Sequence, residues 1–179
     1  SGDLPTVPDG STLVDVLVDG DFETSTGSFA SDAAGTATRV TQNTIDGTGS
    51  LSVTLTPWAR FYSVDRDYPY GLGPIGDSVT VKARVRVESG STVGVCAVAY
   101  TEDGSYLTSC QELDTSSSSI VSNVYLSIPV GRRQLDRVYF MITHQDTGTA
   151  TAVLDNAHLY VVGTPAPTPD PGPGPGPGP

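Results

Sequence analysis

The segment from Ser78 to Val87 alternates strictly between apolar and polar side chains, which constrains the fold more than any other feature of the chain. One set of alternate positions holds Val79, Val81, Ala83, Val85 and Val87, and the other holds Thr80, Lys82, Arg84 and Arg86. Side chains of a β-strand point to opposite faces in turn. Because neighbouring cations cannot face a dry core, the alternation predicts a strand whose valines pack inward and whose cations are exposed.

Similar short segments recur along most of the chain. Valine, threonine, serine and glycine are abundant. No stretch of eleven or more residues keeps the 3.6-residue apolar period of a helix. Strands are predicted at 13–18, 38–41, 50–56, 58–65, 78–87, 93–100, 106–112, 124–129, 136–143 and 150–162. About ten short strands separated by polar turns predict an all-β protein, specifically an antiparallel β-sandwich of the jelly-roll type.

Composition divides the chain into three parts. Residues 1–12 contain prolines and glycines and are expected to form an irregular lead-in, and residues 13–163 carry the predicted strands as one domain. Residues 164–179 read TPAPTPDPGPGPGPGP. Proline fixes φ and removes backbone donors, so this tail is predicted to be a disordered linker. No apolar run is long enough for a transmembrane helix.

Acidic residues outnumber basic ones by 20 to 9, and the formal net charge is −11. Binding to nucleic acid or to an anionic membrane requires a cationic surface. Neither partner is therefore expected. An excess of one charge keeps a protein in solution, and the chain is expected to be a monomer.

Two cysteines flank a predicted turn. Cys96 and Cys110 each lie seven residues from Asp103, so a hairpin centred there would place them opposite or nearly opposite each other on one face. That geometry suits a cross-strand disulfide, and the alternative is a pair of buried free thiols. The disulfide is favoured because the Pro/Gly tail also suggests a secreted, extracellular protein.

Three segments resemble a known family. They are Leu17-Val18-Asp19-Gly20-Asp21-Phe22-Glu23, Gly47-Thr48-Gly49-Ser50-Leu51-Ser52-Val53 and Leu154-Asp155-Asn156-Ala157-His158-Leu159. In this order, and with the cationic strand between them, they are similar to jelly-roll carbohydrate-binding modules of the family four and family twenty-two type. Asp19 stands where that family's opening motif has asparagine. The resemblance implies a non-catalytic domain that binds a polysaccharide and is joined by a linker to a secreted catalytic domain.

The same resemblance implies a structural calcium ion that ties the N-terminal strand to the C-terminal strand. Its ligands would be Asp21, Glu23, a backbone carbonyl of Gly49, and Asp155. Calcium takes six to eight oxygen ligands, and a cluster of carboxylates repels itself without a cation or hydrogen-bond donors. The alternative is a solvated acidic turn. If calcium is bound, a chelator is expected to lower the melting temperature.

The resemblance also places the Ser78–Val87 strand in a concave sheet that holds the sugar chain. Tyr106 would then be a stacking aromatic, with Cys96 and Cys110 on the same face. Strand alternation independently places Arg60 and Tyr62 on the same face of one strand. It places Arg137, Tyr139 and Met141 on the same face of another strand. The predicted ligand-binding residues are Lys82, Arg84, Arg86, Tyr106, Arg137, Tyr139, Arg60 and Trp58.

A cleft of arginines and tyrosines suits a uronate polymer such as alginate or pectin, or a neutral β-glucan or xylan. The alternative for each arginine is a weak surface ion pair, and the single tryptophan would equally suit a core. Motifs for a nucleophile elbow, a zinc protease or a phosphate loop are absent from the sequence. No enzymatic activity is expected. The alternatives are a polysaccharide lyase using Tyr139 with Arg137, and an adhesin-type sandwich that binds protein.

Overall fold

Ten β-strands form the regular structure of the computed structural model, which describes residues 4–64, 66–69, 71–90, 92–113 and 120–165. They are β1 (Thr12–Asp15), β2 (Gly35–Val40), β3 (Ser50–Leu55), β4 (Arg60–Tyr62), β5 (Arg66–Asp67), β6 (Ile75–Ser89), β7 (Val93–Thr101), β8 (Tyr106–Leu113), β9 (Ser122–His144) and β10 (Ala150–Thr164). Over these ranges there is no helix long and apolar enough to cross a membrane. The predicted all-β, antiparallel fold is confirmed.

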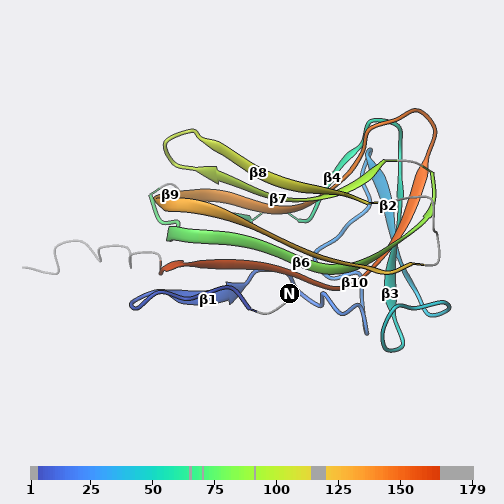
Figure 1. Ribbon diagram of the computed structural model, residues 1–179, viewed down its shortest axis with the longest axis horizontal. Helices are drawn as coiled ribbons and strands as arrows, with labels where there is room; N and C mark the ends of the chain where they lie inside the picture. Colours follow the sequence, from blue (N-terminus) through green and yellow to red (C-terminus); the bar gives the residue numbers. More distant parts are fainter. Residues whose placement is uncertain (1–3, 65, 70, 91, 114–119, 166–179) are drawn as a thin grey trace, which may run out of the picture.

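The strands form two layers, seen one above the other in Figure 1. The β6 sheet contains β2, β3, β10, β6 and the first part of β9, with β1 also paired to β10. The β7 sheet contains β8, β7 and the second part of β9, with β4 and β5 along the other edge of β9. Every pairing described is antiparallel.

Strand β9 belongs to both sheets. Its first part pairs with β6 as far as Gln134, and its second part pairs with β7 from Leu135 onward. Near the end of the first part, Gly131 and Arg132 have positive φ and the register with β6 shifts. A bulge of this kind lets one strand pass from one sheet to the other. The two strands predicted at 124–129 and 136–143 are therefore one continuous element.

The inner faces of the two sheets enclose one large apolar core. Val79, Val81, Ala83, Val85 and Val87 of β6 all lie in it, as the alternation predicted. Four phenylalanines, Phe22, Phe29, Phe61 and Phe140, are buried together, and the Phe29 and Phe140 rings meet edge to face at 5.5 Å. Apolar burial of this extent supplies most of the stability of a domain of this size.

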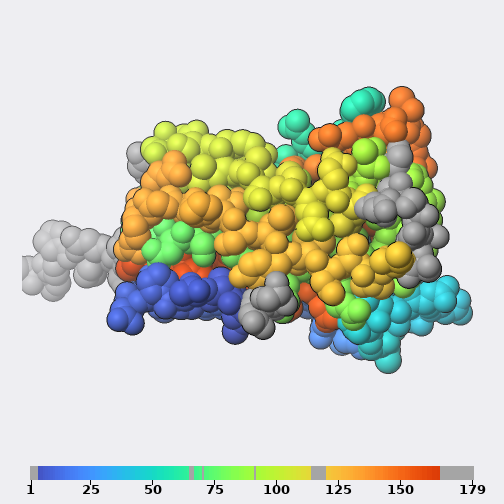
Figure 2. Space-filling view, viewed as in Figure 1, coloured from blue at the N-terminus to red at the C-terminus, as the bar shows by residue number. Residues whose placement is uncertain are grey.

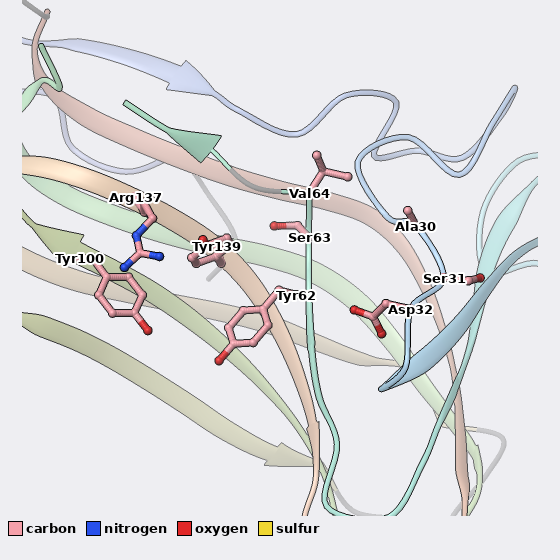
Figure 3. Close-up of a pocket in the computed structure, with 9 residues that line it drawn as sticks. All are labelled: Ala30, Ser31, Asp32, Tyr62, Ser63, Val64, Tyr100, Arg137 and Tyr139. Atoms are coloured by element: carbon pink, nitrogen blue, oxygen red, sulfur yellow. The ribbon is translucent and has the colours of Figure 1, made fainter. Parts of the chain in front are cut away.

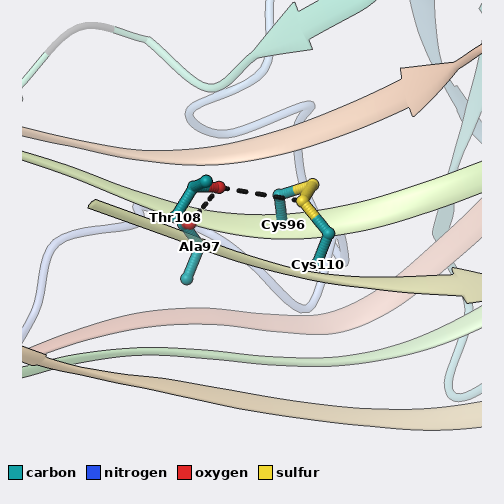
Figure 4. The surroundings of a disulfide bond; sticks show 4 residues. All are labelled: Cys96, Ala97, Thr108 and Cys110. Atoms are coloured by element: carbon teal, nitrogen blue, oxygen red, sulfur yellow. Dashed lines mark hydrogen bonds between the residues drawn. A yellow bond between two sulfur atoms is a disulfide. The ribbon is translucent and has the colours of Figure 1, made fainter. Parts of the chain in front are cut away.

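The hairpin of β7 and β8 has the predicted register. Cys96 lies directly opposite Cys110, and the two form a disulfide with Cα atoms 4.1 Å apart (Figure 4). The turn closes through a hydrogen bond from the Thr101 N–H to the Ser105 carbonyl, and Gly104 there has a φ of 88°. Beside the disulfide, the Thr108 hydroxyl donates to the Ala97 carbonyl at 3.1 Å. The predicted disulfide is confirmed.

Other element boundaries differ from the prediction. The strand predicted at 58–65 is shorter, because Trp58 lies in a turn with a φ of 59° and only Arg60–Tyr62 pairs with β9. Strand β1 begins at Thr12 and β10 ends at Thr164, close to the predicted domain limits. Residues 166–179 of the predicted linker lie outside the described residues.

Candidate functional site

The predicted ligand-binding residues lie on two opposite faces of the sandwich. Lys82, Arg84 and Arg86 point outward from the β6 sheet, because their valine neighbours line the core between the sheets. Arg137 and Tyr139 alternate with the core residues Val138 and Phe140, so they point outward from the β7 sheet. The prediction of a single cleft containing both groups is therefore wrong. The strand pattern showed which side of each strand is exposed, but not which sheet holds the strand.

The hairpin was also assigned to the wrong face. Tyr106, Cys96 and Cys110 lie on the outer face of the β7 sheet, whereas they were expected beside Lys82 and Arg84. No strand pairing joins β7 to β6 within the described chain. The expectation came from the resemblance, which did not fix how the strands divide between the two sheets.

The outer face of the β7 sheet gathers tyrosines from four strands. Tyr106 of β8 is opposite Tyr100 of β7, which is opposite Arg137 of β9. Two residues along β9, Tyr139 lies between Tyr62 of β4 and Tyr100, with ring centroids 5.1 and 6.3 Å away. The Tyr100 and Tyr106 rings are 5.0 Å apart. Edge-to-face and tilted contacts of this kind hold aromatic rings in fixed orientations.

A hollow of about 460 Å³ lies beside these rings (Figure 3). One wall consists of Tyr62, Tyr100, Arg137 and Tyr139, and the other consists of the 30–32 loop with Ser63 and Val64. The loop is held in place because the Asp32 carboxylate accepts hydrogen bonds from the Ala34 and Gly35 N–H groups at 2.7 and 3.1 Å. Open clefts of this size, with rings on one side and polar groups on the other, suit an elongated polar ligand.

Arg137 is held above the Tyr100 ring. Its guanidinium carbon is 4.3 Å from the ring centroid, a cation–π contact. Carboxylate oxygens of Asp136 and Asp67 lie 3.5 and 3.9 Å from its Nε. The Arg137 side chain is 40% exposed. Figure 3 shows the guanidinium directed over the ring at the edge of the hollow. Arg137 is therefore oriented by its neighbours and still accessible to a ligand.

The exposure of the tyrosines divides their roles. Tyr106 is 46% exposed, whereas Tyr139 is 9% exposed and forms the floor under Tyr62 and Tyr100. Burial raises the pKa of Tyr62, with contributions from Tyr100 and Tyr106. Its hydroxyl therefore stays protonated over the whole physiological range and is available as a neutral hydrogen-bond donor.

The remaining two predicted ligand residues lie away from the hollow. Arg60 is on the same face as Tyr62, opposite Thr143 at the far end of β9. Trp58 is 65% exposed in the turn before β4, where its backbone N–H donates to the Asp146 carbonyl at 3.3 Å. Neither residue lines the hollow.

Sequence reasoning missed Tyr100 and Asp32 as site residues. Tyr100 and Tyr106 each lie three residues from Asp103, so the symmetry that predicted the disulfide also pairs these two tyrosines. Asp32 had no comparable signal, because it comes from a loop rich in Ser, Ala and Gly that only the tertiary fold brings to the β7 sheet.

The three segments that carry the family resemblance meet in space. Gly20 accepts a hydrogen bond from the Ala157 N–H at 2.8 Å, and a Cβ at position 20 would come within 1.9 Å of the Ala157 carbonyl oxygen. Ser50 donates to the buried Asp155 carboxylate at 2.7 Å. Glu23 accepts hydrogen bonds from the Thr48 hydroxyl and the Thr48 and Gly49 N–H groups. The segments therefore tie the N-terminal region to β3 and β10.

Hydrogen-bond donors surround the carboxylates predicted to bind calcium. Hydrogen bonds from Thr48 hold the pKa of Glu23 below its usual value. Burial raises the pKa of Asp155, and the hydrogen bond from Ser50 partly opposes that shift. The Asp21 carboxylate accepts a long hydrogen bond from the Glu23 N–H at 3.4 Å. Over the described ranges, no group of three or more His, Cys, Asp or Glu side chains is placed to hold a metal ion.

A guanidinium lies among the carbonyl oxygens of this region. Arg39 Nε donates to the Phe22 carbonyl at 2.7 Å, and its Nη2 donates to the Glu23 carbonyl at 2.6 Å. A Cβ at position 49 would lie 2.7 Å from Arg39 Nε and 2.1 Å from the Phe22 oxygen, so glycine is needed there. Protein donors thus engage the Glu23 and Asp155 carboxylates and Arg39 engages the adjacent carbonyls, which argues against calcium binding by Asp21, Glu23, Gly49 and Asp155 in this arrangement.

Chelation is expected to leave the melting temperature unchanged, whereas the Arg39→Ala substitution is expected to lower it. The melting temperature of the wild-type protein should not change in excess EDTA. Arg39→Ala should lower stability by about 2 kcal/mol, because two carbonyls lose a charged donor. For a domain of this size that is a decrease of about 5 °C in the melting temperature. Differential scanning calorimetry measures both. A clear decrease on chelation of the wild-type protein would restore the calcium prediction.

Comparisons with known proteins agree with this fold. No protein-family model matches the sequence, and no curated protein matches it. Among solved structures, a family 16 carbohydrate-binding module is similar with a TM-score of 0.57 and 12% identity, over 80% of this chain and 98% of that one. The CBM22-1 xylan-binding domain of Paenibacillus barcinonensis Xyn10C has a TM-score of 0.55 and 10% identity, over 79% and 91%.

A third solved structure contains a similar domain within a longer chain. It holds the CBM22-1 and GH10 modules of Clostridium thermocellum endo-1,4-β-D-xylanase 10B with xylohexaose. The TM-score is 0.54 at 12% identity, over 83% of this chain and 28% of that one. The jelly-roll fold of such modules is thus shared by this chain, and the resemblance to the family twenty-two type is confirmed at the level of the fold.

Proposed function

We propose that this chain is a non-catalytic carbohydrate-binding module whose β7-sheet outer face binds a polysaccharide chain. One observation carries the proposal: Tyr62, Tyr100 and Arg137 come from three different strands and line one open hollow, and Tyr106 of a fourth strand packs against Tyr100. Solved structures of the same fold include modules described as carbohydrate-binding.

The chemistry of this face matches that of a sugar chain. Tyrosine rings offer flat apolar area to the C–H faces of a pyranose, and their hydroxyls exchange hydrogen bonds with sugar hydroxyls. The Arg137 guanidinium offers several donors in one plane, and the Asp32 carboxylate offers acceptors on the opposite wall. Binding of this kind requires no group that makes or breaks a bond, which agrees with a non-catalytic role.

The charges around the hollow favour a neutral ligand. Asp67 and Asp136 already flank Arg137, and Asp32 adds a third carboxylate. A uronate would bring its own negative charge among these acids, whereas a neutral sugar would not. A β-glucan or a xylan is therefore the proposed ligand class for this face.

The proposed setting is extracellular. The Cys96–Cys110 disulfide suits an oxidising compartment, and the Pro/Gly-rich tail suits a spacer to a second domain. In this proposal the chain is a monomeric module that carries a covalently attached catalytic domain to its polysaccharide. Neither nucleic acid nor a membrane is a partner.

Affinity electrophoresis tests the proposal. The protein is run in native gels containing hydroxyethylcellulose, barley β-glucan, xylan, alginate or pectin, with bovine serum albumin as the non-binding control. Retarded migration is expected with at least one neutral polysaccharide, without release of new reducing ends on incubation. Unchanged migration in every gel would refute the proposal, and new reducing ends would point to an enzyme such as a lyase or hydrolase.

A further inference from the structure

We infer that the outer face of the β6 sheet carries a second, separate binding site, for a sugar residue with a carboxylate group. A hollow of about 620 Å³ lies on that face, on the opposite side of the sandwich from Arg137. Its lining comes from the three central strands of the sheet and consists of Lys82, Ala83, Arg84, Asn123, Val124, Tyr125, Asn156 and His158.

Lys82 lies at the centre of this hollow. The register places it directly between Tyr125 of β9 and His158 of β10. Its half-buried side chain makes no ion pair or hydrogen bond to any residue that the structure describes. An ammonium that has no protein partner and lines a hollow is available to an incoming anion.

The other basic side chains of the hollow already have acidic partners. Arg84 Nη1 lies 2.5 Å from an Asp46 oxygen, and the His158 Nδ1 lies 2.7 Å from an Asp15 oxygen. Arg86, further along β6, is paired with Glu88 at 3.0 Å and donates to the Asn43 carbonyl. Lys82 is therefore the cation of this hollow that has no acidic partner among the described residues. The site matches a ligand that brings a carboxylate to this ammonium.

The polar neighbours of Lys82 match the hydroxyls of a sugar. The Asn123 amide and the Tyr125 hydroxyl have no hydrogen-bond partner among the described residues, and both line the hollow. An amide offers donors and an acceptor, and a phenol offers one of each. The His158 and Tyr160 rings stack at 5.1 Å beside the hollow and stiffen that wall. A hexuronate presents one carboxylate and several hydroxyls, which these groups would satisfy together.

This inference rests on the proposed function only in taking the ligand to be a polysaccharide, and it concerns a different surface and an acidic sugar. The β7-sheet face has tyrosines and an acid-flanked arginine, and the β6-sheet hollow has a lysine without a partner. A polysaccharide containing both neutral and acidic residues could be held on two sides.

Isothermal titration calorimetry with trigalacturonate and its fully methyl-esterified form tests this site. Lys82→Gln is expected to weaken trigalacturonate binding at least tenfold, and the ester should bind the wild-type protein at least tenfold more weakly than the acid. Arg132→Gln is the matched control, because it removes one positive charge from an exposed side chain outside the hollow. It should leave trigalacturonate affinity unchanged, and melting curves check that both variants fold.

The outcomes separate this site from the proposed one. Equal affinity of wild-type and Lys82→Gln protein for trigalacturonate, or no wild-type binding at millimolar ligand, would overturn the second site. Either result leaves neutral-glycan binding by the β7-sheet face untouched. Conversely, a wild-type protein that binds trigalacturonate but no neutral glycan would overturn the proposed function and not this site. An Arg137→Ala variant should keep its trigalacturonate affinity.

Discussion

Arg137→Ala is expected to weaken binding of a neutral hexasaccharide, such as cellohexaose or xylohexaose, about 30-fold. The substitution removes several donors at the edge of the hollow and uncovers the Tyr100 ring, which now lies 4.3 Å below the guanidinium. Truncation of an arginine or tyrosine at the centre of a binding surface typically costs about 2 kcal/mol, which corresponds to this factor. Isothermal titration calorimetry on the sugar that gives the strongest gel retardation provides the measurement.

Two further variants test whether the whole tyrosine face takes part. Tyr62→Ala should weaken binding by a similar factor, because it removes a ring that lines the hollow and packs on Tyr139. Arg132→Ala should bind like the wild-type protein, because Arg132 forms its ion pair with Asp77 away from this face. If Arg137→Ala and Arg132→Ala bind equally well, the β7-sheet face is not the binding surface.

Loss of the Cys96–Cys110 disulfide is expected to destabilise the protein by about 3 kcal/mol. The bond closes a short loop, with a sequence separation of 14, and cross-links of this length restrict the unfolded chain by about that amount. The expected decrease in melting temperature is about 10 °C for a domain of this size. The Cys96→Ala/Cys110→Ala variant and reduction of the wild-type protein by dithiothreitol should agree, since reduction leaves the packing atoms in place.

The disulfide also bears on the proposed binding face. Cys96 lies opposite Met141 of β9, and Met141 lies opposite Tyr62, so the bond continues the outward surface of the β7 sheet. Strand β8 pairs only with β7 along the described chain, and it carries Tyr106. Reduction should therefore weaken neutral-sugar binding below the melting transition as well. Oxidised and reduced proteins with equal melting temperatures would contradict the stability argument.

The two hollows differ in charge, so the two proposed binding sites would take different sugars. The acids around Arg137 make the β7-sheet hollow unsuitable for a uronate, whereas Lys82 makes the β6-sheet hollow suitable for one. In a chain with a net charge of −11, the neighbouring cations Arg84 and Arg86 both have acidic partners, whereas Lys82 has none among the described residues.

In Figure 2, β8 and β9 cover much of the visible face, with β1 along its edge.

Local pattern alone predicted most of the strands of this protein and which side of each is exposed. The period-two alternation of β6 predicted its buried valines and its outward lysine and arginines, because neighbouring side chains of a strand must point in opposite directions. The symmetry about Asp103 likewise predicted the hairpin and its disulfide, because the register of a hairpin follows from the centre of its turn.

Only the tertiary structure decided which sheet each strand joined. Lys82 and Arg137 are both outward on their strands, yet they lie on opposite sides of the sandwich, because β6 pairs with β10 while the second part of β9 pairs with β7. The tertiary structure also decided the hydrogen-bond partners of Arg39, because its two carbonyl partners are 16 and 17 residues away along the chain. Alternation is a local property of each strand, whereas sheet membership depends on pairings between distant segments that compete for the same core.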